Sequence, residues 1–344
     1  MIVHETTASR VLLGPGSRHA VPDEVDRTGA SRVLLVSTGS AAAAAADLAE
    51  ALDGRLAGRF DRPVVHTPLS VTDEAMSVVT SSVADVVVAI GGGSAVGLSK
   101  AIAARTGMPQ VVVPTTYAGS EVTPVLGETA DGVKTTRRDP ALTPGTVVYD
   151  PELTLSMPEG LTLTSALNAL AHAVEALWAP DPTPVSDALA TEAATGIVGS
   201  LPVVLGAPAD VAGRSRLQGA AWLAGLCLAQ TRMGLHHQLA HALGGTFDLP
   251  HAELHAMLLP HVMAFDLPSA PAASARLARA VGGDPVAVVA GLAASYDGPR
   301  TLRELGVPRE GLAVVAERVV DAPYPNPRPL VLDEVLALLE AAWG

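Results

Sequence analysis

The feature that most restricts the fold of this chain is an alternation of two kinds of segment over its first half. Between about residues 33 and 150, short runs rich in β-branched residues alternate with alanine-rich stretches typical of helices. The apolar runs lie at 33–36, 86–90, 111–113 and 147–149, and the alanine-rich stretches at 41–53 and 94–105. Because the runs are continuously apolar, they suit strands buried on both faces. The pattern predicts a parallel sheet with helical crossovers.

Beyond Pro158 the β-rich runs largely vanish, and alanine and leucine recur with a helical period. Glycine and proline interrupt this part at 213, 244, 268, 282–285 and 323–329. Gly244–Gly245 is predicted to end one helix, and Pro250 to stand at the first turn of the next. A chain of 344 residues is long enough for two cores. We therefore expect an α/β domain over 1–158 and an all-helical domain over 159–344.

Composition limits the protein's surroundings and partners. The net charge of −13 would repel phosphate backbones, which argues against a nucleic-acid partner. No uncharged apolar stretch reaches the ~18 to 20 residues that cross a bilayer, and no secretory signal follows Met1, so we expect no membrane association and a cytoplasmic location. The single cysteine, Cys227, lies in an apolar run and is predicted to be a packed core thiol.

A buried-type strand at 86–90 leads into Gly91, Gly92, Gly93 and Ser94, and a helix-like stretch follows. Glycines let the backbone approach a phosphate closely, and a helix N-terminus offers free N–H groups and a positive dipole end. The loop is predicted to be a pyrophosphate cradle; a plain tight turn is the alternative. It is not a G-x-G-x-x-G fingerprint, since Val96 replaces the last glycine. Hydroxyls and a glycine at 114–121 follow the next strand, at the same predicted sheet edge.

Histidines gather in one short window of the second half. Six of the ten lie between 236 and 261, at His236, His237, His241, His251, His255 and His261, and His172 has a similar setting upstream. On a helix, His237 and His241 share one face, while His251 would come from the start of the next helix. Imidazole is both a general acid or base and a metal ligand. The alternative is a set of hydrogen-bonded interface histidines.

Taken together, these segments resemble the iron-containing alcohol dehydrogenase superfamily, and within it the maleylacetate reductases. The resemblance runs nearly end to end and rests on 91–94, 114–121, 138–140, 168–175, the His237 segment and 247–253. It implies a dehydroquinate synthase-like fold, with an α/β dinucleotide-binding domain over 1–158 and an all-helical catalytic domain over 159–344. By the same resemblance we expect a homodimer.

In metal-dependent members of that superfamily, three histidines and an aspartate hold the ion and a fourth histidine relays a proton. By resemblance the three are His172, His237 and His251, and the relay is His241. Asn168 stands where the aspartate would be, and a neutral amide oxygen is a weaker partner for a divalent cation. A metal is therefore not expected to be required, although His172, His237 and His251, with Asn168, are the residues that would hold one. Asparagine at this position is itself typical of the maleylacetate reductases.

The resemblance also implies a nicotinamide cofactor. The expected cofactor-binding residues are Gly91, Gly92, Gly93, Ser94, Thr115, Thr116, Lys134 and Thr38. Because Ser37–Thr38 replace the acidic residue common in NAD-specific relatives, both NADH and NADPH are expected to bind. The alternative for Lys134 and its neighbours Arg137 and Arg138 is that they are solvent-exposed charges of a loop. Gln238 stands where a lysine is frequent in the reductases, which leaves the exact substrate open.

The implied reaction is reduction of the carbon–carbon double bond of 2-maleylacetate to 3-oxoadipate by NADH or NADPH, in the breakdown of aromatic compounds. Protonated imidazoles are expected to supply positive charge and a proton: His241 as donor, with His172, His237 and His251 holding the anionic oxo acid. Tyr117 and Thr115 would border the nicotinamide. The alternatives are a metal-dependent alcohol dehydrogenase of the same superfamily and a non-reductase that keeps the fold in a biosynthetic pathway.

Overall fold

The computed structural model describes His4, Thr6 and residues 9–130 and 133–344, and its contacts divide the chain into two compact units. The α/β unit comprises Glu5–Met157 and Ala209–Gln218. The helical unit comprises Pro158–Pro208 and Gly219–Gly344, together with His4. The assignment of 209–218 to the first unit was not anticipated from the sequence.

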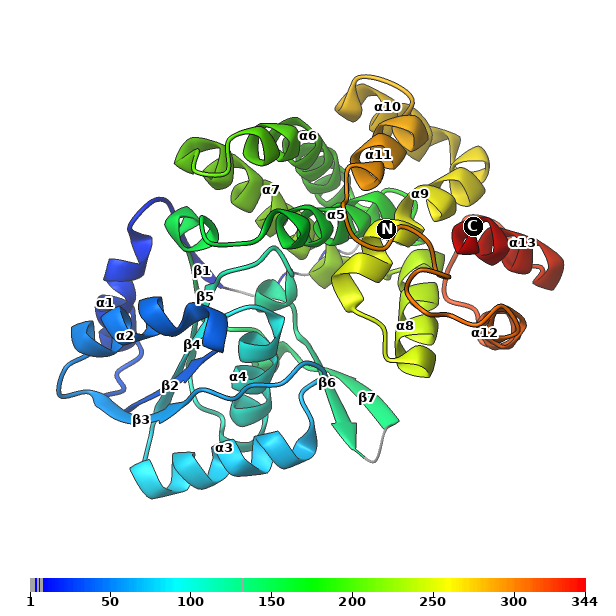
Figure 1. Cartoon of the computed structure of the whole chain (residues 1–344). Coiled ribbons are helices and arrows are strands. Elements are labelled where there is room, and N and C mark those ends of the chain that lie inside the picture. The colour runs from blue at the N-terminus through cyan, green and yellow to red at the C-terminus, as the bar shows by residue number, and fades with distance from the viewer. Residues whose placement is uncertain (1–3, 5, 7–8, 131–132) are drawn as a thin grey trace. The chain divides into compact units, whose positions relative to one another are not determined.

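The α/β unit is built on a six-stranded sheet whose strand pairs are all parallel (Figure 1). The strands, in spatial order, are β1 (Arg10–Leu13), β8 (Thr146–Tyr149), β5 (Gln110–Pro114), β4 (Val86–Gly91), β2 (Val33–Ser37) and β3 (Leu56–Phe60). The four inner strands are buried along their whole length. This confirms the parallel sheet predicted from the continuous apolar runs.

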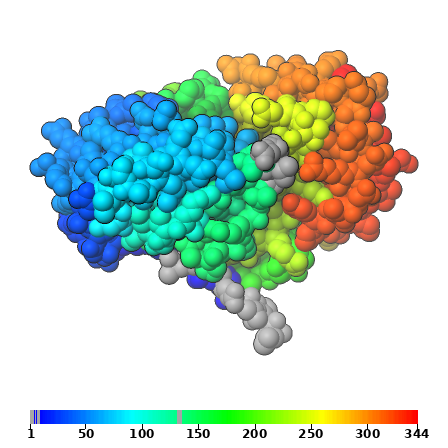
Figure 2. Space-filling view, turned by 90° about the horizontal axis from the view of Figure 1, so that it is seen from below, coloured from blue at the N-terminus to red at the C-terminus, as the bar shows by residue number. Residues whose placement is uncertain are grey.

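Four helices accompany the strands: α1 (Val21–Arg27), α2 (Ala42–Ala51), α3 (Leu69–Ser82) and α4 (Gly93–Thr106). Residues of α1 and α2 share one hydrophobic cluster with β2, β4 and β5. Helix α4 packs against β4 and β5 and contacts α3. In the space-filling view, the light-blue segment that includes α3 forms an outer surface of this unit (Figure 2). The alanine-rich stretches predicted as helices are therefore the helices that cover the sheet.

An antiparallel hairpin interrupts the alternation, formed by β6 (Val125–Ala130) and β7 (Val133–Arg138). The sequence did not predict it, because β6 mixes apolar and polar residues of which only Leu126 is buried, and residues 135–138 of β7 are polar and exposed. Short 3-10 turns complete the described structure: η1 (Ser17–Ala20), η2 (Gly39–Ala41), η3 (Ser120–Val122), η4 (Pro140–Leu142), η5 (Pro151–Thr154) and η6 (Leu267–Ser269).

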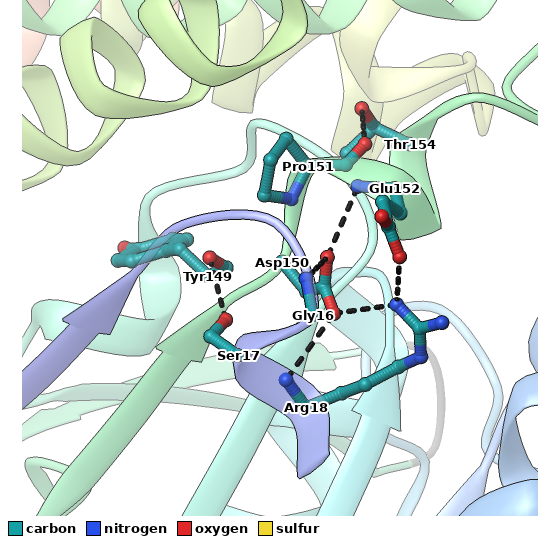
Figure 3. A network of polar contacts seen from close by, with 8 residues as sticks. All are labelled: Gly16, Ser17, Arg18, Tyr149, Asp150, Pro151, Glu152 and Thr154. Carbon is teal, nitrogen blue, oxygen red and sulfur yellow. Dashed lines mark hydrogen bonds and ion pairs between the residues drawn. The ribbon is translucent and has the colours of Figure 1, made fainter. Parts of the chain in front are cut away.

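A buried carboxylate ties the ends of two neighbouring strands together (Figure 3). Asp150, just after β8, accepts hydrogen bonds from the backbone N–H groups of Gly16 (3.1 Å) and Arg18 (3.2 Å) in the segment after β1. The Arg18 guanidinium bridges Asp150 and Glu152, with its Nη1 2.7 Å and 2.5 Å from the two carboxylates. Hydrogen bonds to a charged carboxylate are stronger than those between neutral groups. The network therefore holds the segments that follow β1 and β8 together.

The second half is all helical, as predicted. Its helices are α5 (Glu159–Ala176), α6 (Pro184–Gly206), α7 (Val211–Gln230), α8 (Leu235–Phe247), α9 (His251–Asp266), α10 (Pro271–Val281), α11 (Pro285–Ala294), α12 (Gly311–Asp321) and α13 (Leu332–Trp343). Helix α5 is buried almost throughout and packs against α6 and α9. A second core joins α8 and α9 to α12 and α13. Cys227 is fully buried and burial raises the pKa of its thiol to about 12, which confirms a packed core thiol.

Two predicted helix boundaries are wrong. Gly244–Gly245 do not end α8, which continues to Phe247 and stops where Asp248 adopts a left-handed conformation (φ 52°). Gly213 lies inside α7 instead of interrupting it. A glycine weakens a helix without ending it, and neighbouring packing can override its preference.

Within the described residues, α6 is long and apolar enough to span a bilayer by length and composition. It carries Asp187, however, which forms an ion pair with Arg276 of α10. It also packs against α5 and α10, as expected of a helix inside a soluble domain.

Candidate functional site

The glycine triplet lies at the point where the strand order of the sheet reverses. Strands β2 and β4 are neighbours, yet the chain leaves β2 toward β3 on one side and leaves β4 toward β5 on the other. In open α/β sheets the crevice at such a switch point, outside the carboxyl ends of the strands, is where ligands bind. The predicted residues Gly91 and Thr38 follow these two strands directly.

Side chains around the triplet show why glycine is needed there. Gly91 has φ +147°, and a Cβ on it would lie 2.6 Å from the Thr38 hydroxyl oxygen. A Cβ on Gly92 would lie 3.1 Å from Thr116. Helix α4 begins at Gly93 with no side chain capping it, so its first N–H groups can serve an anion. These features fit the pyrophosphate of a dinucleotide.

Backbone hydrogen bonds tie the neighbouring loops to this cradle. Thr38 donates its N–H to Ile90 O (3.2 Å), and Thr115 donates to Gly91 O (3.0 Å). The structure thus brings together seven of the eight predicted cofactor residues, namely Gly91, Gly92, Gly93, Ser94, Thr115, Thr116 and Thr38. The eighth, Lys134, lies on β7, and its side chain is outside the described residues.

Lys100 supports the same edge, although it was not among the predicted site residues. Its buried ammonium donates to the carbonyl oxygens of Ser120 (2.5 Å), Thr123 (2.8 Å) and Val125 (2.9 Å). These residues follow the β5 loop that carries Thr115 and Thr116. The signal available in the sequence was a lone lysine among apolar residues of α4.

Tyr117, predicted to border the nicotinamide, is 1 % exposed. Arg214, on the part of α7 that belongs to the α/β unit, donates from Nη1 to the Tyr117 hydroxyl (3.4 Å). The tyrosine is thus a packed side chain in this structure, and its contact with a cofactor stays a prediction.

The predicted histidines of the helical unit form one continuous ring cluster. His172 of α5 stacks on His237 of α8, with centroids 5.1 Å apart, and His237 lies 6.2 Å from His241 one turn later. His251, at the start of α9, stacks on His241 at 6.4 Å. His172 and His237 are buried, whereas His241 and His251 are exposed. The cluster therefore joins a buried imidazole pair to a pair that can exchange protons with water.

Two further histidines complete the cluster, although they were not predicted as site residues. The rings of His236 and His255 share a hydrogen bond of 2.8 Å between Nε2 and Nδ1, and both side chains are fully buried. His255 also lies 4.9 Å from His237 and 4.3 Å from His251, centroid to centroid. The sequence signal that could have identified them as site residues was their position among the six histidines between 236 and 261.

Burial determines the charge of several of these rings. It lowers the pKa of His172 well below its ordinary value, helped by the nearby His237, and it lowers the pKa of His236 to about 3. Burial likewise lowers the pKa of His255. These three rings are neutral at pH 7, because the charged form is disfavoured away from water. His172 is thus a neutral hydrogen-bonding group at pH 7, and its role in holding the substrate stays a prediction.

Four buried polar atoms on α5 and α8 have no hydrogen-bond partner among the described residues: Asn168 Oδ1, His172 Nδ1, His236 Nδ1 and His237 Nε2. Asn168 and His172 are one turn apart on α5, so they share a face. Buried polar atoms are nearly always satisfied, and an unsatisfied group costs about 1 to 3 kcal/mol. Such a set is the arrangement expected where a polar ligand supplies the missing partners.

A divalent metal does not fit these residues well. Among the described side chains, no group of three or more histidines, cysteines or carboxylates is placed to hold an ion. Asn168 offers a neutral oxygen, and Glu175, the carboxylate that contacts the cluster, already accepts bonds from the His236 backbone and the His237 ring. The His172, His237 and His251 set therefore lacks an anionic ligand to complete a metal site, although three histidines alone can hold zinc.

Gln238 does not face the histidine cluster with an open amide. Its Nε2 donates to Val319 O (3.0 Å) and Ala322 O (2.7 Å), and its Oε1 accepts from Tyr324 N (2.9 Å). The side chain thus holds the end of α12 and the loop after it. All the hydrogen bonds described for this amide are thus made within the helical unit, and the choice of substrate at this position stays open.

A dinucleotide cradle at a sheet switch point and a histidine cluster in a helical unit are together typical of a dehydrogenase. Residues 8–151 match the family described as iron-containing alcohol dehydrogenase, and residues 162–343 match the C-terminal part of the Fe-containing alcohol dehydrogenase family. The chain belongs to the iron-containing alcohol dehydrogenase family and is an oxidoreductase.

Individual relatives narrow the comparison. The chain is 45 % identical to a maleylacetate reductase of Sphingobium indicum, over 99 % of this chain and 97 % of that protein. It is 44 % identical to maleylacetate reductase 1 of Rhodococcus opacus, over 97 % and 94 % of the two chains. Among solved structures, maleylacetate reductase from Agrobacterium tumefaciens superposes with a TM-score of 0.95 at 44 % identity, covering 100 % of this chain and 98 % of that one.

Proposed function

We propose that this protein reduces the carbon–carbon double bond of 2-maleylacetate to give 3-oxoadipate, using NADH or NADPH. Relatives that carry the name maleylacetate reductase, at 41 to 45 % identity over nearly the whole chain, support this substrate. The observation that carries the proposal is the set of unpartnered polar atoms on Asn168, His172 and His237, which suits a polar oxo acid.

The bound nicotinamide would supply a hydride to the alkene carbon farther from the ketone. Negative charge then develops on the ketone oxygen as an enolate, which must be stabilised and protonated. Asn168, His172 and His237 are the residues we assign to holding the oxo acid, through the amide and imidazole groups that lack partners. We assign the proton donor to His241, which is exposed and lies one turn after His237, so that it would take a proton from water and deliver it. General acid catalysis of this kind contributes roughly 10²- to 10⁴-fold.

The remaining assignments follow from the same residues. Ser37–Thr38 present hydroxyls and no carboxylate at the end of β2, which supports use of NADPH as well as NADH. The poor fit of Asn168 and its neighbours to a divalent ion supports catalysis without an obligatory metal, although the family is named for iron. We also propose that the protein is a cytoplasmic homodimer and takes part in the breakdown of aromatic compounds.

The test is oxidation of NADH and NADPH, followed by absorbance, with freshly prepared maleylacetate and with enzyme assayed before and after chelation. We expect turnover that chelation leaves unchanged. Turnover lost on chelation would show that Asn168 still permits a metal site. No turnover with maleylacetate, but activity with simple aldehydes, would favour an ordinary alcohol dehydrogenase; no oxidation with any of them would favour a non-reductase.

A pair of histidine variants gives the matched control. His172→Gln removes a ring of the cluster and should lower kcat/KM at least 100-fold. His261→Gln changes a partly buried histidine of α9 that makes none of the ring contacts described above, and should leave kcat/KM near the parent value. Equal effects of the two changes would remove the cluster from the mechanism.

A further inference from the structure

Glu175 is a fully buried carboxylate on α5, less than one turn after His172. Both of its oxygens are used by α8. Oε1 accepts the backbone N–H of His236 (2.7 Å), and Oε2 accepts the ring Nδ1–H of His237 (2.5 Å). One side chain thus holds both the start of α8 and the orientation of the imidazole that this helix carries into the cluster.

These bonds determine which nitrogen of His237 carries the hydrogen. An ionised carboxylate can only accept hydrogen bonds, so the nitrogen facing it must be the protonated one. The other carboxylate oxygen, Oε1, already accepts the backbone N–H of His236, and accepting hydrogen bonds favours the ionised form of a carboxylate. Nε2 is then the only ring nitrogen of His237 left for a ligand, and it has no partner among the described residues.

The backbone at the start of α8 is shaped around this carboxylate. Gly234 is the N-cap and provides no side chain, so Glu175 takes the part of a capping acceptor from another helix. A Cβ on Gly234 would lie 3.0 Å from Glu175 Oε1 and 2.9 Å from Pro325 O. The positive end of the helix dipole adds a further attraction for the charge.

We propose that Glu175 is a positioning residue for the reduction: it holds His237 as the Nδ1–H tautomer and presents Nε2 to the substrate. The rate effect rests on the proposed function; the tautomer does not. A hydrogen bond from a second residue is a general means of fixing the tautomer and orientation of a functional histidine. Its loss typically costs 10- to 100-fold where the histidine binds a metal, and we expect an effect of similar size here.

The test uses the full-length protein labelled with ¹⁵N-histidine, in which two-bond couplings from the ring nitrogens to the ring carbon protons distinguish the two tautomers. The His237 signals are identified by their absence from His237→Asn. In the parent protein we expect Nδ1 to be protonated and Nε2 to be bare. An Nε2–H tautomer in the parent spectrum would overturn the proposal, whatever the enzyme's activity.

Two variants then connect the tautomer to the rate. Glu175→Gln should give a mixture of tautomers and a kcat about 10- to 100-fold lower, with the KM for the nicotinamide cofactor unchanged. Glu175→Asp, which keeps the charge but shortens the reach, should recover part of the rate. Glu24→Gln makes the same change of carboxylate to amide at a buried site of the α/β unit, where the carboxylate accepts from Arg10 Nε (3.0 Å), and should change neither readout.

Each result is decisive. Retention of both the tautomer and kcat in Glu175→Gln would overturn the positioning role. If the parent protein fails to reduce maleylacetate, the proposed function fails, while the parent spectrum still decides the tautomer.

Discussion

Asn168 shows how much a single residue restricts the chemistry of this site. It lies one turn before His172 on the most buried helix of the unit, where a carboxylate would add a charge between α5 and α8. The amide instead adds an unpartnered oxygen, Oδ1, without charge. The rings of His172 and His236 are also neutral at pH 7. The anionic carboxylate of Glu175 is held by its hydrogen bonds to α8. A carboxylate or an enolate oxygen can therefore enter this part of the site without displacing another anion.

Asp266 provides a prediction about pH dependence. Its buried carboxyl accepts a hydrogen bond from Asn326 (2.7 Å), and burial raises its pKa to about 7. Between its unfolded pKa, about 4, and pH 7 the folded protein keeps a proton that the unfolded chain has lost, so this group's contribution to stability decreases as the pH rises through that window. Asp266→Asn cannot titrate, and its Tm relative to the parent should rise by several degrees from pH 5 to pH 8. Thermal unfolding at both pH values measures this; a constant Tm difference would contradict it.

At the scale of the element, α8 offers two glycines with opposite expectations. A Cβ on Gly234 would meet Glu175 and Pro325, whereas a Cβ on Gly245 would meet nothing within 4 Å. Gly234→Ala should therefore displace Glu175, lower Tm and lower kcat. Gly245→Ala lies in the exposed helix interior and should stabilise the protein by about 0.5 to 1 kcal/mol with kcat unchanged. Thermal unfolding and steady-state kinetics of both variants check this, and similar behaviour of the two would refute the role of Gly234.

The elements also show where sequence patterns suffice. Strands β2, β4, β5 and β8 were predictable because burial on both faces demands continuous apolar residues. Strand β3 and the β6–β7 hairpin were not predictable. Their strands mix apolar residues with glycine or polar residues, so they show no continuous apolar run. The end of α8 was misplaced because its apolar face packs into the core shared with α12 and α13, which outweighs the preference of two glycines.

For the whole molecule, the two units contribute different parts of the chemistry, and each was predictable to a different degree. The glycine cradle and the histidine cluster were evident because both rely on residue types that are costly to place without a function. The supporting groups were not: Glu175, Lys100 and Gln238 act through partners distant in sequence, and nothing local indicates whether a buried polar residue binds a ligand or a neighbouring helix.

The most direct test of the central claim is to locate the transferred hydride. NADH or NADPH deuterated on the transferring face would be oxidised with maleylacetate, and the product examined by NMR. We expect 3-oxoadipate with its ketone intact and deuterium on the former alkene carbon farther from that ketone. Deuterium on a carbinol carbon, with the double bond retained, would contradict it and identify the protein as a carbonyl reductase.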